Sequence, residues 1–336
     1  MGRLLSLPLA VVCVVALLSG CPKPPPETPT TPAGPAASST PGAAAGGKIG
    51  LSVLTMTNPF FKEIADAMTD EAAKSGYEVI VVSSEEDPAK QFSQVQDFIV
   101  QQVGAIVLTP ANSKSVGTAI QEANKAGIPV FTADIASLAE DAKVVSHIAT
   151  DNYSGGREAA KAMMEALGNK GKVAIIDHPE VESVILRTKG FRDELKEAGS
   201  PIEIVGAWPG KGSKDEAFKV AQDVLTAHKD LNGIFAINDP SALGACAAIE
   251  KAGKTGRITV VGFDGQLEGK QAILEGRIFA DPIQFPDQIG RQTVQTILKY
   301  LGGEQVEPEI LIPTKLYYKA DAEQDPVLKG GPASQP

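Results

Sequence analysis

Residues 48–82 read KIGLSVLTMTNPFFKEIADAMTDEAAKSGYEVIVV. Two apolar runs rich in β-branched residues, 49–54 and 78–82, flank a segment from 60 to 75 in which apolar residues recur at helical spacing. This segment ends at Lys74-Ser75-Gly76, and a lysine followed by a glycine is a common helix C-terminus. The stretch therefore predicts a strand–helix–strand unit whose two strands lie parallel in one sheet.

The same alternation continues to the end of the chain. Further strands are expected at residues 105–108, 130–133, 173–176, 202–207, 233–237, 258–263 and 309–316. Further helices are expected at residues 89–102, 114–126, 155–167, 184–198, 215–228, 242–252 and 288–301. Because most of these strands are apolar on both faces, they indicate parallel sheets that are covered by helices on both sides.

So many units could close into one barrel or form two doubly wound sheets. A long irregular connection, residues 134–145, follows the first four units, and a second series of units starts at His147-Ile148-Ala149-Thr150. We therefore predict an α/β protein of two doubly wound parallel-sheet lobes rather than a barrel.

Composition excludes several classes of protein. The 336 residues include 31 Lys and Arg against 41 Asp and Glu, a net charge of −10, without a basic block of the kind that binds nucleic acid. A hydrophobic content of 43% excludes a polytopic membrane protein, and three cysteines are too few for a disulfide scaffold.

The first 47 residues predict export and anchoring. Arg3 precedes the apolar run 4–18, and Leu18-Ser19-Gly20-Cys21 resembles a bacterial lipobox. We expect residues 1–20 to be a lipoprotein signal peptide and Cys21 to carry the lipid that anchors the chain to a membrane from the outside. Residues 21–47 are rich in proline and alanine, so we expect them to form a tether.

Polar residues follow several predicted strands. They are Asn58, Asp134, the pair Asp177-His178, the pair Asn238-Asp239, and Asp264. Such residues are also common in turns and as helix caps. Ligands bind at the carboxyl ends of the strands in open parallel sheets, and Phe60 and Phe61 lie next to the first of these positions. Hydrogen-bonding groups beside aromatic rings suit a neutral polyhydroxylated ligand.

Residues 48 to about 319 resemble the periplasmic sugar-binding proteins of ABC importers, closest to the ribose and allose type. The resemblance is carried by residues 57–61 (TNPFF), 144–152 (VVSHIATDN), 225–228 (LTAH), 238–239 (ND), 260–265 (VVGFDG) and 286–290 (PDQIG). It implies a type I periplasmic binding protein fold with a three-stranded hinge. It places residues 48–150 and 285–313 in the N-terminal lobe, residues 151–284 and 314–320 in the C-terminal lobe, and leaves residues 321–336 as a disordered tail.

By the same resemblance, eight residues would contact the sugar: Asn58, Phe60, Phe61, Asp134, Arg187, Asn238, Asp264 and Gln284. The two rings would cover one face of the sugar, and the two aspartates would accept hydrogen bonds from hydroxyls. Arg187 would donate from the second lobe, and the amides of Asn238 and Gln284 would donate and accept. Without the resemblance, Arg187 reads as a surface charge and Gln284 as a turn or hinge residue.

Three positions depart from the ribose-type pattern. Leu54 replaces a serine-like residue, Ile135 replaces an arginine that grips the sugar, and Gly212 replaces an aromatic residue. Trp208, in the same loop as Gly212, is an alternative aromatic contact. We therefore expect a ligand other than ribose.

Three other functions compete with sugar import. An enzyme is disfavoured because only His178, of three histidines, lies at the ligand edge and no G-x-S-x-G, HExxH or CxxC motif occurs. A repressor with the same lobes would carry DNA-binding helices where the lipobox and tether stand. A binding protein that presents sugar to a membrane receptor stays open. The expected partners are a sugar, an ABC permease and, through Cys21, a membrane; we expect a monomer with no cofactor, metal, catalytic residue or nucleic acid.

Overall fold

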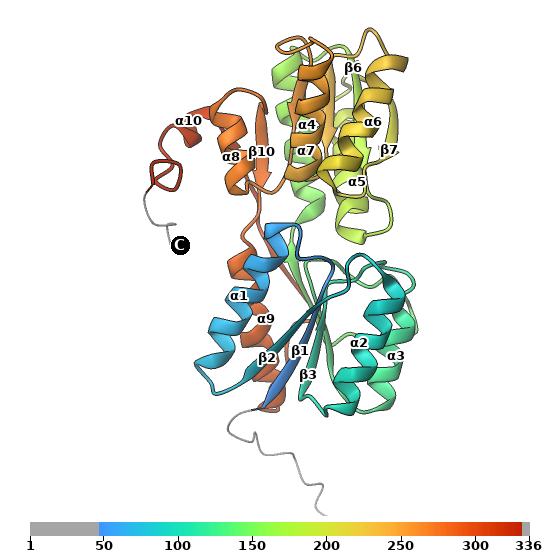
Figure 1. The fold of residues 1–336 in the computed structure, drawn as a ribbon, viewed down its shortest axis with the longest axis vertical. Helices are drawn as coiled ribbons and strands as arrows, with labels where there is room; N and C mark the ends of the chain where they lie inside the picture. The colour runs from blue at the N-terminus through green and yellow to red at the C-terminus, as the bar shows by residue number, and fades with distance from the viewer. Residues whose placement is uncertain (1–46, 331–336) are drawn as a thin grey trace, which may run out of the picture. The chain divides into compact units, whose positions relative to one another are not determined.

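The computed structural model describes residues 47–330. The signal peptide, Cys21 and almost all of the predicted tether lie outside the described residues, as do residues 331–336 at the end of the predicted tail. The described chain forms two six-stranded sheets with strand orders β11-β5-β4-β3-β1-β2 and β12-β10-β9-β8-β6-β7 (Figure 1). This confirms the prediction of an α/β fold built from two sheets.

All strands of the first sheet are parallel. They are β1 (Lys48–Val53), β2 (Glu78–Ser83), β3 (Ala105–Leu108), β4 (Val130–Ala133), β5 (Ser146–Thr150) and β11 (Glu309–Ile312). Helices α1 (Pro59–Ala73) and α9 (Pro286–Leu301) pack together on one face of it, and α2 (Pro88–Val100) and α3 (Gly117–Lys125) on the other (Figure 1). We call this sheet with its four helices the first lobe.

The second sheet is parallel except for its edge strand β12, which is antiparallel to β10. Its strands are β6 (Lys172–Asp177), β7 (Glu203–Pro209), β8 (Gly233–Ala236), β9 (Thr259–Val261), β10 (Ala280–Ile283) and β12 (Lys315–Tyr318). Its helices are α4 (Asn152–Leu167), α5 (Glu182–Glu197), α6 (Lys214–Ala227), α7 (Asp239–Lys251), α8 (Leu267–Leu274) and α10 (Lys319–Ala322). Helices α4 and α5 pack together, as do α6 and α7, and we call this unit the second lobe.

Two predictions about strands were wrong. The strand at residues 146–150 does not start the second series, because β5 pairs with β4 and β11 in the first sheet. The expected strand at 309–316 is two strands, β11 and β12, which belong to different sheets. Pro313 lies between them, and since proline has no N–H to donate it interrupts the hydrogen-bonded ladder there.

The chain passes between the lobes three times: from β5 into α4, from β10 into α9, and from β11 into β12. These passages form the expected three-stranded hinge. Within residues 47–330, no helix combines the length and apolar character that a membrane crossing requires.

Candidate functional site

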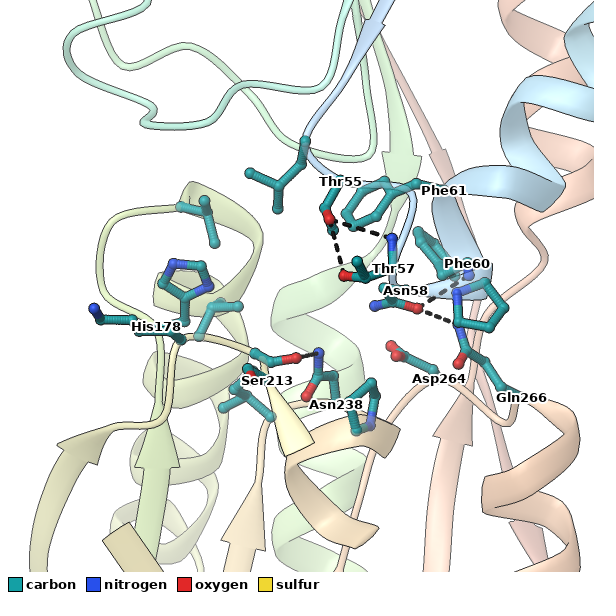
Figure 2. Close-up of a pocket in the computed structure, with 18 of the residues that line it drawn as sticks. Thr55, Thr57, Asn58, Phe60, Phe61, His178, Ser213, Asn238, Asp264 and Gln266 are labelled. Atoms are coloured by element: carbon teal, nitrogen blue, oxygen red, sulfur yellow. Dashed lines mark hydrogen bonds between the residues drawn. The ribbon is translucent and has the colours of Figure 1, made fainter. Parts of the chain in front are cut away.

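A cavity of about 640 Å³ lies between the carboxyl-terminal ends of the strands of the two lobes. The structure brings all eight predicted contact residues to its wall: Asn58, Phe60, Phe61, Asp134, Arg187, Asn238, Asp264 and Gln284. Figure 2 shows the first-lobe residues around Asn58 facing the second-lobe residues Asn238 and Asp264.

The first-lobe wall is formed by the turn between β1 and α1. Asn58 caps α1, and its Oδ1 accepts hydrogen bonds from the backbone N–H of Phe60 at 3.0 Å and from Nε2 of Gln266 in the second lobe at 2.8 Å. The rings of Phe60 and Phe61 pack edge to face with centroids 5.5 Å apart, and both are almost fully buried. They are therefore part of the core and offer a fixed apolar surface to the cavity.

Asp134 follows β4 directly, in a left-handed backbone conformation with φ of 64°. It is 3% exposed, and its Oδ1 has no hydrogen-bond partner among the described residues. Burial raises the pKa of Asp134 to about 7, and the nearby Arg187 only partly opposes this shift. A buried carboxyl group in a cavity wall with an unpaired oxygen is suited to accept a hydrogen bond from a ligand.

Arg187 on α5 is buried, so the alternative of a surface charge is wrong. Its Nε donates to Oδ1 of Asn152 at 2.8 Å, and its Nη1 donates to the carbonyl of Ile237 at 2.7 Å and to Oδ1 of Asp264 at 3.3 Å. The guanidinium carbon lies 3.9 Å from the ring centroid of Phe263. These contacts hold the guanidinium plane in one orientation at the cavity wall.

Asp264 and Gln284 form the adjoining part of the wall. Nε2 of Gln284 donates to Oδ1 of Asp264 at 2.7 Å, while Oε1 of Gln284 has no partner among the described residues. Burial raises the pKa of Asp264 to about 6, and the contacts with Arg187 and Gln284 oppose the shift. Asp264 has a φ of 108°, a conformation that is costly for a residue with a side chain and that clusters at functional sites.

Both polar atoms of the Asn238 side chain form hydrogen bonds within the protein. Its Oδ1 accepts from the backbone N–H of Ser241 at 3.0 Å, as the cap of α7, and its Nδ2 donates to the carbonyl of Gly212 at 3.0 Å. Each amide nitrogen carries two hydrogens, so one N–H stays available to a ligand.

The positions that depart from the ribose-type pattern also line the cavity. Leu54, Ile135 and Gly212 are all in its wall. Trp208 is not in the wall; it packs against His228 with ring centroids 5.6 Å apart, so the alternative that it replaces the missing aromatic contact was wrong.

Sequence reasoning did not include His178 and Gln266 among the ligand contacts, although both line the cavity. His178 follows β6, and this position at a strand end was the available signal. Gln266 is placed by contact with the opposite lobe, and no local pattern in the sequence indicates such a contact.

A second set of hydrogen bonds joins the lobes outside the cavity wall. The backbone N–H of Ser113 donates to the carbonyl of Glu180 at 3.0 Å, and the backbone N–H of Glu182 donates to Oγ of Ser113 at 2.9 Å. Together with the Asn58–Gln266 bond, they hold the two lobes closed around the cavity.

The polar groups of the wall comprise hydrogen-bond acceptors, amides and one fixed guanidinium. Among residues 47–330, no group of three or more His, Cys, Asp or Glu side chains is arranged to hold a metal ion. The arrangement suits a ligand that has several hydroxyl groups and an apolar face.

The family model described as a periplasmic binding protein domain matches residues 49–305. The ribose import binding protein RbsB of Escherichia coli K12 is 37% identical over 284 residues, which cover 84% of this chain and 94% of the relative. An ABC transporter solute-binding protein from Agrobacterium vitis with bound D-fucose is 31% identical, has a TM-score of 0.78, and is matched over 85% of this chain and 99% of its own. A periplasmic solute-binding protein from Actinobacillus succinogenes with bound D-allose is 28% identical and has a TM-score of 0.76. The match covers 83% of this chain and 99% of that protein.

Proposed function

This chain belongs to the periplasmic binding protein domain family, and we propose on that premise that it captures a sugar or a sugar-like polyol between its two lobes. Its relatives are solute-binding proteins, and the chain is a binding protein of the same kind rather than an enzyme. Family membership also places it outside the cytoplasm.

The observation that carries the proposal is the buried polar wall formed by Asp134, Arg187 and Asp264. Asp134 has an oxygen without a partner among the described residues, and Arg187 is held by hydrogen bonds to Asn152 and Ile237 of its own lobe. A preorganised site of this kind loses little conformational freedom on binding, so more of the interaction energy appears as affinity.

We assign the contacts as follows. Phe60 and Phe61 cover one face of the sugar ring, and the two aspartates accept hydrogen bonds from its hydroxyls. Arg187 donates to a ring or hydroxyl oxygen. Three amides complete the set by donating or accepting: Asn58, Asn238 and Gln284.

Lobe closure is the proposed binding motion, and the three passages of the chain between the lobes are its hinge. We place residues 48–150 and 285–313 in the N-terminal lobe, residues 151–284 and 314–320 in the C-terminal lobe, and residues 321–336 in a tail that begins with the last two residues of α10. The closed monomer delivers its sugar to the permease of an ABC importer. Anchoring through lipid on Cys21 keeps it beside the membrane, with residues 21–47 as the tether.

Presentation of the sugar to a membrane receptor is the second candidate function. It uses the same closed form, and a receptor kinase gene instead of permease and ATPase genes beside this one would favour it.

Calorimetric titration after a thermal-shift screen of pentoses, hexoses and polyols tests the proposal. A ligand at 100 times its Kd stabilises the protein by about 2.7 kcal/mol. We expect Asp134→Ala, Arg187→Ala and Asp264→Ala each to weaken binding about 5- to 150-fold, because each leaves a ligand hydroxyl or a buried group unpaired.

Arg192→Ala on the same helix as Arg187, and Asp223→Ala on α6, are matched controls because both side chains are exposed and lie outside the cavity wall. We expect these two variants to bind like the wild type. If all three cavity variants bind the ligand as tightly as the wild type, the assignment of the site is wrong. If no sugar or polyol in the screen binds, the proposed function is wrong.

A further inference from the structure

The two ends of the cavity wall carry different polar side chains. Asp134, Arg187 and Gln284 lie around Asp264, and His178 lies on the opposite side of the cavity from Asp264 (Figure 2). We propose that the His178 end binds the exocyclic hydroxymethyl group of a hexose, so that this protein prefers a hexose to the corresponding pentose. This inference rests on the proposed function, since it concerns the same cavity.

His178 is a buried polar side chain without a hydrogen-bond partner among the described residues. It is 8% exposed, and its Nε2 lies 3.7 Å from Oε2 of Glu180, which exceeds hydrogen-bond distance. Since the ring makes no side-chain hydrogen bond within residues 47–330 and lines the cavity, its nitrogens are available to a ligand group.

Gly212 lies beside this ring in a left-handed backbone conformation with φ of 64°. A Cβ at position 212 would point between two side chains, 3.1 Å from Nδ2 of Asn238 and 3.5 Å from Nδ1 of His178. A larger side chain there would enter the space between these polar groups. Glycine therefore keeps a side chain from crowding these two polar groups of the cavity wall.

Burial keeps the imidazole of His178 in its neutral form. Burial lowers the pKa of His178, with Lys211 acting in the same direction and Glu180 and Asp177 against it. Glu86 of the first lobe and Asp215 also line the cavity.

A hydroxymethyl group matches the chemistry of these neighbours. A neutral imidazole has one donor and one acceptor nitrogen, and a hydroxyl group can serve either. Ser213 adds a hydroxyl from the first residue before α6, where it makes no capping hydrogen bond. The buried side chains of Val181 and Leu243 line the same cavity and can cover the methylene carbon.

The test uses pairs of sugars that differ only in this group: D-xylose and D-glucose, L-arabinose and D-galactose, and D-ribose and D-allose. In the pair that binds most tightly, calorimetry should show the hexose bound at least about five-fold more tightly than the pentose, which corresponds to one net hydrogen bond. His178→Ala should remove this preference and leave pentose affinity within about two-fold of wild type, as expected for a change outside the pentose contacts.

Two further variants separate a ligand contact from a structural role. His178→Gln keeps a donor and an acceptor and should retain part of the hexose preference. His228→Ala is the matched control, because His228 lies outside the cavity wall and should leave both affinities unchanged.

Equal or tighter binding of the pentose by the wild type would overturn the inference. Equal weakening of both sugars by His178→Ala would also overturn it, since His178 would then only support the fold. Binding of no sugar in the panel would refute the proposed function itself, and the inference with it.

Discussion

The carboxyl group of Asp134 is buried with one oxygen unpaired, and this has a consequence for stability. Its pKa is about 7 in the folded chain against 3.8 as the ordinary value. A pKa raised by folding stabilises the folded state below the unfolded value, and the contribution is lost as the pH rises through the folded value. For Asp134 this window runs from about pH 4 to pH 7, and the loss is at most about 4 kcal/mol.

Asp134→Asn removes the titration and keeps both the shape and the tolerance of a left-handed backbone. We expect the free energy of unfolding of the wild type to fall relative to this variant between pH 4 and pH 7 in the absence of ligand. Denaturant unfolding at several pH values measures the difference, with the exposed Asp223→Asn as control. If the free energies of unfolding of the wild type and Asp134→Asn changed in parallel with pH, the carboxyl group would not be buried as the structure has it.

Helices α4 and α5 position Arg187 through their close contact. A Cβ at Gly156 of α4 would lie 2.1 Å from the carbonyl oxygen of Arg187, and a Cβ at Gly190 of α5 would lie 2.1 Å from the carbonyl oxygen of Tyr153. Two glycines therefore allow the helix backbones to approach to a distance that any side chain would prevent.

Gly190→Ala should destabilise the protein by about 1–3 kcal/mol and weaken ligand binding, because α5 must move away from α4 and carry Arg187 with it. In a free helix the same change would stabilise by up to about 1 kcal/mol, so the sign of the effect is diagnostic. Gly104→Ala is the control, since a Cβ there would make only ordinary contacts. Denaturant unfolding measures the stability, and calorimetric titration measures the affinity for the ligand. A Gly190→Ala variant that is more stable than the wild type and binds with unchanged affinity would contradict this account of the helix contact.

Elements with a local sequence pattern could be predicted well. Elements and side-chain positions that depend on contacts with residues distant in sequence could not. Strand β4 and the position of Asp134 after it follow from an apolar run and the residue that ends it. Strand β10 contains Asp281 and Pro282, so its sequence does not read as a strand, and it forms because β9 and β12 pair with it. The buried position of Arg187 depends on Asn152, Ile237 and Asp264, which are distant in sequence, and only the family resemblance indicated it.

At the scale of the whole molecule, closure of the lobes is stabilised away from the ligand by Ser113. This first-lobe residue is fully buried, lies outside the cavity wall, and makes two hydrogen bonds to Glu180 and Glu182 of the second lobe. Because these bonds join the two lobes, they favour the closed over the open arrangement. Apparent affinity depends on the fraction of molecules that can reach the closed state, so a residue that never touches the ligand can change it.

Ser113→Ala removes the hydroxyl that accepts from the N–H of Glu182 and keeps the backbone bond to Glu180. The loss of about 1 kcal/mol from the closed state should weaken ligand binding about five-fold. The effect should appear mainly as faster dissociation, since association precedes closure. Ser115→Ala, exposed in the same turn, is the matched control and should bind like the wild type. Stopped-flow binding measures both rates. An unchanged dissociation rate in Ser113→Ala would show that the hydroxyl contact with Glu182 adds nothing to closure.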